Sequence, residues 1–307
     1  MRQPPPLSML PHYPVVGGLA LLSLAVTVAG WAEVVDVSPL LATPHIWEGQ
    51  VWRLFTSILI HADFMHLAFN LYWLWVLGSV VEEEFGHLRT LGIVLFLAIG
   101  SMAPEYALLY GGVGLSGVGY GLAGMLWVLS RRDERFRGAM DRDTAALFVA
   151  WFFICILLTV TNVYPVGNIA HGAGAVLGAL LGLAVSARRV RGTAVALAVV
   201  VPLAAGGAAL YARPYINLTK ERGWELSRLG YLALERDRDR EAVRHLEAAV
   251  RVDESLGTAW FNLGLAHQRL GRRKEASEAY RRAVELEPRN DEFREALEDI
   301  EGPLKAE

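Results

Sequence analysis

The feature that most constrains this chain is a series of apolar segments, most of them long enough to cross a lipid bilayer. As a helix, about 20 mostly apolar residues span the hydrocarbon core, which is ~30 Å thick. The sequence predicts seven spans, at residues 14–33, 64–81, 88–110, 116–130, 144–163, 169–187 and 193–211. We therefore expect an all-α, polytopic membrane bundle, because a helix satisfies its own backbone hydrogen bonds in lipid.

Charge divides the chain into two parts. Residues 1–212 contain 11 Lys and Arg and 12 Asp and Glu, whereas residues 213–307 contain 18 and 20. This break predicts a membrane part followed by a polar, soluble part. The net charge of −3 gives no reason to expect a nucleic-acid partner. Cys155 is the one cysteine, which excludes a disulfide within the chain.

Basic residues set the expected orientation in the bilayer. Arg2, Arg89, the five arginines at positions 131–142 and the three at 188–191 fall on one side, and only Arg53 lies in the loops of the other. The positive-inside rule then places the N-terminus in the cytoplasm and, after seven spans, the C-terminal region outside. We expect an integral protein of a prokaryotic cytoplasmic membrane. An uncleaved first span is favoured over a signal peptide because only Arg2 precedes it and more spans follow.

The fourth predicted span is short and opens in a glycine-dense stretch at residues 112–121. At ~1.5 Å per residue it covers only part of the bilayer, so Ser116 at its start lies below the outer surface. The connection at residues 111–115 must then dip into the membrane, and glycine allows the irregular turn that this requires. Irregular backbone at that depth is tolerated where it is buried or lines a water-filled cavity. A cavity beside Ser116 is therefore expected.

Other polar residues of the spans are expected near Ser116. His66 and Asn70 stand four residues apart on one face of the second span, and His171 opens the sixth. Under the predicted topology all of them lie toward the outer half of the membrane. Glycines at four-residue spacing in the fourth and sixth spans allow those two helices to approach closely.

These residue types are suited to nucleophilic catalysis. Neutral His171 can remove the proton of the Ser116 hydroxyl, which is otherwise a poor nucleophile. His66, the Asn70 amide and the Ser116 backbone N–H are suitable donors to a developing oxyanion. Tyr120, one turn after Ser116, is expected to pack on the imidazole. No carboxylate is placed to orient His171, so we expect a dyad rather than a triad.

Taken singly, each feature has a simpler interpretation as helix packing, a structural histidine or an interfacial anchor. Their joint occurrence in a fixed order resembles the rhomboid family of intramembrane serine proteases. The matching motifs are Trp52-Arg53, His66-x-x-x-Asn70, Gly114-Leu115-Ser116-Gly117 and Ala170-His171-x-x-Gly174-x-x-x-Gly178.

The resemblance covers residues 14–190 and implies Ser116 as nucleophile and His171 as general base. It implies His66 and Asn70 as oxyanion-hole contributors and Tyr120 as the ring that stacks on the histidine. Trp52-Arg53 becomes a structural motif of the first loop. The resemblance further implies substrates that are membrane-anchored proteins, cut in or near a transmembrane segment, without metal or cofactor. A seventh span, residues 191–212, fits a variant of the family.

The C-terminal part repeats with a period of 34 residues. Leu229-Gly230 recurs as Leu263-Gly264, and Ala242, Leu246 and Ala249 recur as Ala276, Tyr280 and Ala283. Residues 223–301 therefore resemble tetratricopeptide repeats, with residues 291–300 as a capping helix, and a protein partner is expected for them. The alternative is a charged helical spacer. Residues 1–13 are expected to form a tail, residues 213–222 a linker and residues 302–307 a second tail.

Three other functions compete with an intramembrane serine protease. A catalytically silent relative that binds transmembrane helices would be expected to have lost Ser116 or His171, and both are present. A channel or transporter would be expected to have paired charges in its spans and an internal repeat of the membrane half, and neither is found. A metalloprotease is disfavoured because the chain has no His-Glu-x-x-His motif.

Overall fold

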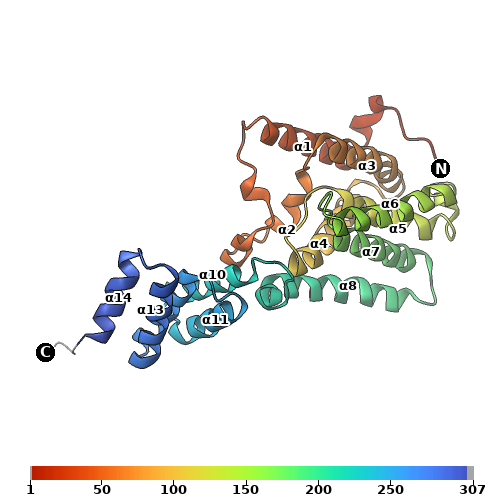
Figure 1. Ribbon diagram of the computed structural model, residues 1–307. Helices are drawn as coiled ribbons and strands as arrows, with labels where there is room; N and C mark the ends of the chain where they lie inside the picture. The colour runs from red at the N-terminus through yellow and green to blue at the C-terminus, as the bar shows by residue number, and fades with distance from the viewer. Residues whose placement is uncertain (1, 303–307) are drawn as a thin grey trace. The chain divides into compact units, whose positions relative to one another are not determined.

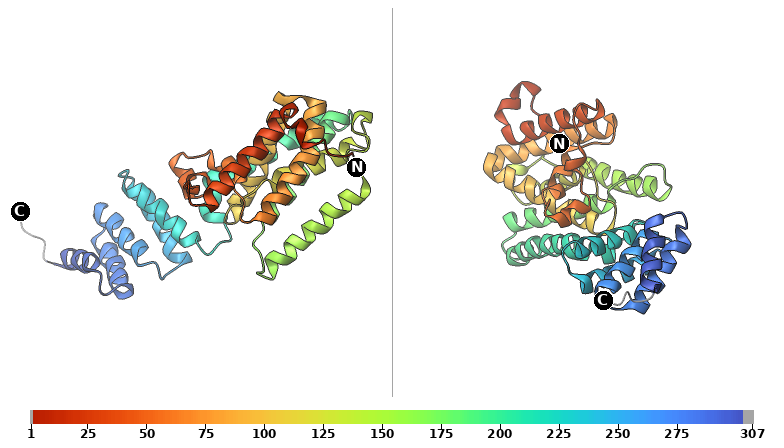
Figure 2. Two further views of the ribbon diagram at one scale, coloured as in Figure 1. Left: turned by 90° about the horizontal axis from the view of Figure 1, so that it is seen from above. Right: turned by 90° about the vertical axis from the view of Figure 1, so that its left-hand side faces the viewer.

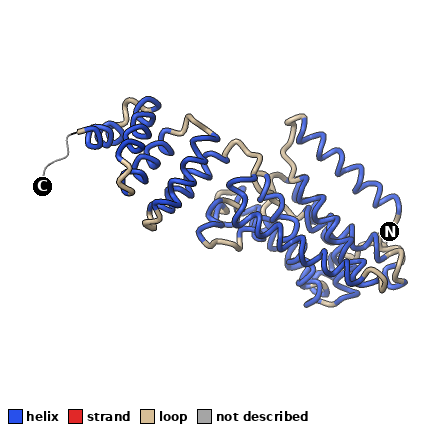
Figure 3. The backbone as a smooth tube through the Cα atoms, turned by 90° about the horizontal axis from the view of Figure 1, so that it is seen from below, coloured by secondary structure: helices blue, strands red, loops and turns tan. Residues whose placement is uncertain are grey.

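The computed structural model describes residues 2–302, so most of the predicted tail at residues 302–307 lies outside the described residues. Every regular element in the described part is helical, which confirms the all-α prediction (Figure 3). The chain divides into two compact units, one ending at Arg213 and one beginning at Pro214. The narrower domain limits that we expected from the sequence stay predictions.

The membrane unit contains six helices that are long and apolar enough to cross a bilayer and a shorter apolar helix, α5. Its α-helices are α1 (Pro14–Trp31), α2 (Arg53–Thr56), α3 (Phe64–Phe85), α4 (His87–Leu108), α5 (Ser116–Leu129), α6 (Arg142–Val160), α7 (Asn168–Ser186) and α8 (Arg191–Gly207). Helix α8 continues through a π-helical turn, Ala208–Ala212, into α9 (Arg213–Ile216). The seven predicted spans thus correspond to seven helices.

Helices α4, α5 and α7 lie side by side in this unit (Figure 1). The contact between α5 and α7 joins bare backbone to bare backbone. A Cβ atom at Gly174 or Gly178 would collide with the carbonyl oxygen of Gly117 or Gly121, and one at Gly182 would lie 2.9 Å from the Met125 carbonyl oxygen. Only glycine at these positions of α7 permits the approach.

The glycines of α5 serve two neighbours. Gly124 faces α7, where an added Cβ would meet the Ala175 carbonyl oxygen. Gly117 and Gly121 instead leave room for α4, whose Ser101 and Leu97 side chains occupy the space that a Cβ would take. The glycine spacing in α5 therefore allows close packing on two sides, and not only against α7.

A buried carboxyl group joins α3 to α1. Glu82 accepts hydrogen bonds from the backbone N–H groups of Val15 and Val16, both at 2.9 Å, at the start of α1. It therefore satisfies donors that a helix N-terminus leaves unpaired. This contact explains why α3 runs to Phe85, past the predicted end of the span at Val81.

Helix α6 lies at the edge of the bundle and is set off from the other helices in Figure 2. Cys155 is its one buried residue. Its contact with the centre of the bundle involves Phe148, whose ring lies 5.3 Å from that of Tyr120 and whose carbonyl oxygen accepts from the Tyr120 hydroxyl at 3.1 Å. Most of its apolar side chains face outward, as expected for a span in lipid.

The second unit stacks helices in pairs. They are α10 (Arg222–Leu234), α11 (Asp239–Val252), α12 (Gly257–Arg269), α13 (Arg273–Leu286) and α14 (Asp291–Glu301). In each pair a glycine of the first helix makes room for a side chain of the second. Gly230 does so for Leu246 and, 34 positions later, Gly264 does so for Tyr280. The 34-residue repeat is thus confirmed as a repeat of the same helix contact.

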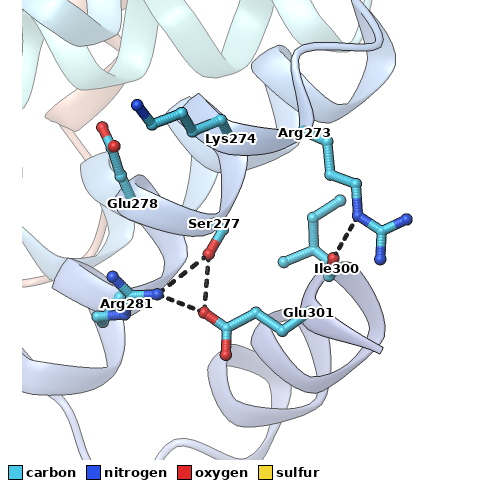
Figure 4. Close-up of a pocket in the computed structure, with 7 residues that line it drawn as sticks. All are labelled: Arg273, Lys274, Ser277, Glu278, Arg281, Ile300 and Glu301. Atoms are coloured by element: carbon cyan, nitrogen blue, oxygen red, sulfur yellow. Dashed lines mark hydrogen bonds and ion pairs between the residues drawn. The ribbon is translucent and has the colours of Figure 1, made fainter. Parts of the chain in front are cut away.

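Helix α14 is fastened to α13 by charged groups around a shallow surface depression (Figure 4). Glu301 accepts from Arg281 at 2.6 Å and from Ser277 at 2.8 Å, while Arg273 donates to the Ile300 carbonyl oxygen at 2.7 Å. On the other side, the rings of Phe261 and Phe293 stack 4.7 Å apart. These contacts fit the predicted role of α14 as a cap on the repeats.

We predict that Gly178→Ala destabilises the membrane unit by about 1–3 kcal/mol, because the methyl group forces α7 away from α5. The measurement is unfolding of the purified protein in detergent micelles. Gly206→Ala is the matched control, since a Cβ at Gly206 of α8 meets nothing within 4 Å. Equal stability of the two variants would contradict the backbone contact.

Candidate functional site

Ser116 and His171 meet at the starts of two neighbouring helices. Ser116 is the first residue of α5 and His171 lies in the first turn of α7. The Ser116 Oγ atom lies 2.8 Å from the His171 Nε2 atom, within hydrogen-bond distance. A neutral imidazole with its proton on Nδ1 can accept the serine proton at Nε2. The pair therefore has the geometry of a nucleophile and its general base.

The Tyr120 ring holds one face of the His171 imidazole. Their centroids are 4.5 Å apart and their planes 24° apart, which is a stacked arrangement. Within the described residues, His171 Nδ1 has no hydrogen-bond partner. No carboxylate binds this ring, so its orientation depends on ring packing and on the position of α7.

The turn before Ser116 is irregular, as expected. Gly111 and Gly114 have φ angles of +81° and +96°, in the left-handed region that side chains disfavour. The Gly114 N–H donates to the Ser57 carbonyl oxygen at 3.3 Å, and the Leu115 N–H donates to His61 Nε2, also at 3.3 Å. The first loop thus holds the backbone that leads to Ser116.

The His61 ring is itself oriented by Thr27. Its Nδ1 lies 3.4 Å from Thr27 Oγ1, and that hydroxyl donates to the Leu59 carbonyl oxygen at 3.0 Å. Nδ1 must therefore carry the ring proton, which leaves Nε2 free to accept from Leu115. This contact between His61 and the backbone of Leu115 was not predicted from the sequence.

His66 and Asn70 lie one turn apart on the same face of α3, and His66 is close to the turn before Ser116. A Cβ at Gly114 would lie 2.6 Å from His66 Nε2, so this ring is next to the turn that carries the nucleophile. The Ala62 N–H donates to His66 Nδ1 at 3.4 Å, which leaves the ring proton on Nε2. Asn70 Nδ2 donates one proton to the His66 carbonyl oxygen at 2.9 Å and retains a second.

The Ser116 backbone N–H is a third donor. The first N–H groups of a helix have no acceptor within the helix, and no side chain caps the start of α5. Ser116 N–H therefore points out of the helix, with the positive end of the helix dipole behind it. Like His66 Nε2 and Asn70 Nδ2, it carries a proton that is available for a further hydrogen bond.

Trp52 and Arg53 lie in the first loop and do not join the dyad. Arg53 is buried and donates to the carbonyl oxygens of Ser38 and Leu41 at 2.6 and 3.1 Å, and to Gln50 Oε1 at 2.8 Å. These hydrogen bonds connect the turns of the first loop to one another. Trp52 is 47% exposed, as an interfacial tryptophan would be. Within residues 2–302 no group of His, Cys, Asp and Glu side chains is arranged to hold a metal ion.

Two further polar contacts around the site were not predicted from the sequence. Glu105 of α4 is buried, and its carboxyl group accepts from the Ala170 N–H at 3.0 Å, one residue before His171. A lone carboxyl group in an apolar span was the signal that could have identified it. The second contact joins Asp63 to the loop before α7, where the Tyr164 hydroxyl donates to Asp63 Oδ2.

Comparison with known proteins finds two families in the chain. Residues 48–188 match the Rhomboid domain, and residues 257–290 match the Tetratricopeptide repeat, which is the second of the two repeats. Over 138 residues the chain is 34% identical to rhomboid protease GlpG of Pectobacterium atrosepticum, a match that covers 43% of this chain and 48% of that protein. Over 104 residues it is 35% identical to rhomboid protease GlpG of Salmonella newport, covering 33% and 37%. The chain thus spans half or less of the curated relatives that it matches.

We predict that an alkyl fluorophosphonate labels Ser116, because His171 activates this hydroxyl. Labelling is measured by mass spectrometry of the purified protein in detergent. It is expected to vanish in Ser116→Ala and to fall at least about 100-fold in rate in His171→Ala. Ser130→Ala, at the far end of α5, is expected to label like the wild type. Equal labelling of wild type and His171→Ala would contradict an activated serine.

A pH-dependent contribution to stability is expected from Asp63. The hydrogen bonds from Tyr164 and from the His66 N–H lower the pKa of the Asp63 carboxyl group below its ordinary value. Burial and the same contact raise the pKa of Tyr164 to about 12. The folded state therefore favours ionised Asp63. This stabilisation is present above the unfolded-state pKa of ~3.9 and is lost as pH falls through the folded-state pKa.

We therefore predict that Tyr164→Phe lowers the free energy of unfolding by about 1 kcal/mol at pH 7. The difference from wild type should be smaller at pH 3, below the unfolded-state pKa of ~3.9, because protonation of Asp63 removes the charge that this hydrogen bond stabilises. Thermal unfolding in detergent micelles at the two pH values measures this. Tyr72→Phe, at a side chain that is 52% exposed, is the control. A difference that is the same at both pH values would contradict the role of ionised Asp63.

Proposed function

We propose that this chain, which carries a rhomboid domain followed by a tetratricopeptide repeat, is a serine endopeptidase that cleaves membrane-anchored proteins within the bilayer. The observation that carries the proposal is the 2.8 Å contact between Ser116 Oγ and His171 Nε2 at the starts of two apolar helices. The similarity to proteins named rhomboid proteases supports it.

In the first step, His171 Nε2 takes the Ser116 hydroxyl proton as Oγ attacks the carbonyl carbon of the scissile peptide bond. The carbonyl π electrons move to oxygen and form a tetrahedral oxyanion. Ser116 N–H, His66 Nε2–H and the free Asn70 N–H donate to that oxygen. Such donors act strongly because the surrounding helices exclude most water.

The intermediate then collapses. The carbon–nitrogen bond breaks, and the proton held by His171 Nε2 passes to the leaving amine, which departs with the C-terminal part of the substrate. The N-terminal part remains as an ester on Ser116. A water molecule that loses its proton to His171 attacks this ester. The bond between the acyl carbon and Oγ then breaks, and His171 returns the proton to Oγ, which restores Ser116 and releases the N-terminal part as a carboxylic acid. No step requires a metal or cofactor.

The membrane setting defines the substrate class. Ser116 begins α5, which has 14 residues and extends for about 21 Å, less than the bilayer core. The dyad therefore lies below one membrane surface, where it meets the backbone of a membrane-anchored chain. In the proposed orientation, in a prokaryotic cytoplasmic membrane, the N-terminus is cytoplasmic and the dyad lies toward the outer side. The repeats, also outside, bind a protein partner.

A catalytically silent role in binding transmembrane helices is the alternative. Such a role would not explain why Ser116 and His171 lie within hydrogen-bond distance of each other. Nor would it explain the ordered turn at Gly114, just before Ser116. The protease accounts for both.

We predict that Ser116→Ala reduces cleavage of a model membrane-anchored substrate at least about 1,000-fold. The reason is that, within residues 2–302, no other hydroxyl is hydrogen-bonded to the His171 ring. Cleavage is measured by gel assay in proteoliposomes. Incubation with EDTA should leave the rate unchanged. Expression and thermal midpoint of the variant should match the wild type, since only one part-buried hydroxyl is removed from a site of the same shape. Cleavage by Ser116→Ala at the normal rate would refute the proposal.

A further inference from the structure

Glu105 is a buried carboxyl group that the proposed chemistry does not use. It belongs to α4, three residues before the last residue of that helix, and it is 3% exposed. It is also the one Asp or Glu in the run from His87 to Leu108. An ionisable group in an apolar span carries a large desolvation penalty, so its presence calls for an explanation.

Its contacts are with the start of α7. Glu105 Oε2 accepts from the Ala170 N–H at 3.0 Å, and the Ile169 N–H also donates to the carboxyl group. Gly167, which precedes the helix, provides no side-chain cap. A Cβ at Gly167 would lie 3.4 Å from the Glu105 carboxyl carbon, so glycine lets this group reach the helix end. Glu105 thus caps α7 from a neighbouring helix.

The capped turn is the one that carries His171. The His171 N–H makes the first regular bond of this turn, to the Gly167 carbonyl oxygen at 3.1 Å. Because His171 Nδ1 has no partner among the described residues, no hydrogen bond fixes the ring itself apart from that to Ser116. The position of the imidazole then depends on Tyr120 and on where the backbone of α7 begins.

We propose that Glu105 is the positioning residue for the general base: it holds the first turn of α7 so that His171 Nε2 stays within reach of Ser116. A triad carboxylate orients the imidazole by accepting a hydrogen bond from the ring, whereas Glu105 orients it by accepting one from the backbone of α7. The effect of Glu105 on the rate rests on the proposed function, whereas its effect on the position of His171 does not.

Two conservative variants separate position from charge. Glu105→Gln retains an acceptor oxygen at the same reach, whereas Glu105→Asp retains the carboxyl group but withdraws it by one methylene. We expect Glu105→Gln to retain kcat within about 5-fold. Glu105→Asp should lose about 10–100-fold in kcat with KM within about 3-fold, because a base displaced by about 1 Å transfers the proton poorly. Glu105→Leu, which has no acceptor, should behave like Glu105→Asp.

Glu82 provides the matched control. It too is a buried carboxyl group that caps another helix, but its partners are Val15 and Val16 of α1. Glu82→Gln and Glu82→Asp should change the thermal midpoint while leaving kcat per folded enzyme within about 2-fold. A purely structural role for Glu105 would give the same pattern as Glu82.

A second readout does not require proteolysis. In protein labelled with ¹³C-histidine, the His171 Cε1–H resonance is assigned by its loss in His171→Ala. It should shift in Glu105→Asp and remain in place in Glu105→Gln and in the Glu82 variants. If the wild type cleaves no substrate, the proposed function fails, and this resonance still decides the positioning role. Should Glu105→Leu fail to fold, the Asp and Gln variants decide. The proposal is overturned if Glu105→Asp matches the wild type in both readouts, or if Glu105→Gln is impaired as much as Glu105→Asp.

Discussion

The packing of α5 against α7 through bare backbone is the interaction on which the rest of the site depends. With Gly174 and Gly178 seated on the carbonyl oxygens of α5, the two helix starts lie close enough for Ser116 and His171 to share a hydrogen bond. Lipid offers no hydrophobic force between helices, so such close contact is a main source of association in the membrane. A methyl group in this contact would separate the dyad.

Buried polar groups then hold in place the helix starts and the turn before Ser116. Glu82 and Glu105 each bind backbone N–H groups at the start of another helix, and His61 binds the N–H of Leu115 before the nucleophile. In each case the acceptor satisfies a donor that would otherwise remain unpaired in an apolar setting, where the penalty is several kcal/mol. At Glu105 and His61, though not at Glu82, the same bond also orients the backbone next to a residue of the site. Stability and positioning are therefore linked in this unit.

The sequence was informative where signals are local. Apolar length predicted the spans, glycine spacing predicted close helices, and the motif around Ser116 predicted a nucleophile next to a histidine. It was uninformative about the partners of Glu105 and His61, because those partners are backbone N–H groups that have no sequence signature. Nor could spacing tell that Gly117 faces Ser101 of α4 as well as α7. Side-chain to backbone contacts between distant segments require the folded chain.

The most direct test of the central claim is reaction with a peptide chloromethyl ketone. This reagent adds to a nucleophilic serine and then alkylates a histidine that lies beside it, so it reports both groups in one product. We predict alkylation of His171 at Nε2 in the wild type, mapped by mass spectrometry, and none in Ser116→Ala. Alkylation of His66 in place of His171, or equal alkylation of His171 without the Ser116 hydroxyl, would contradict a working Ser116–His171 dyad.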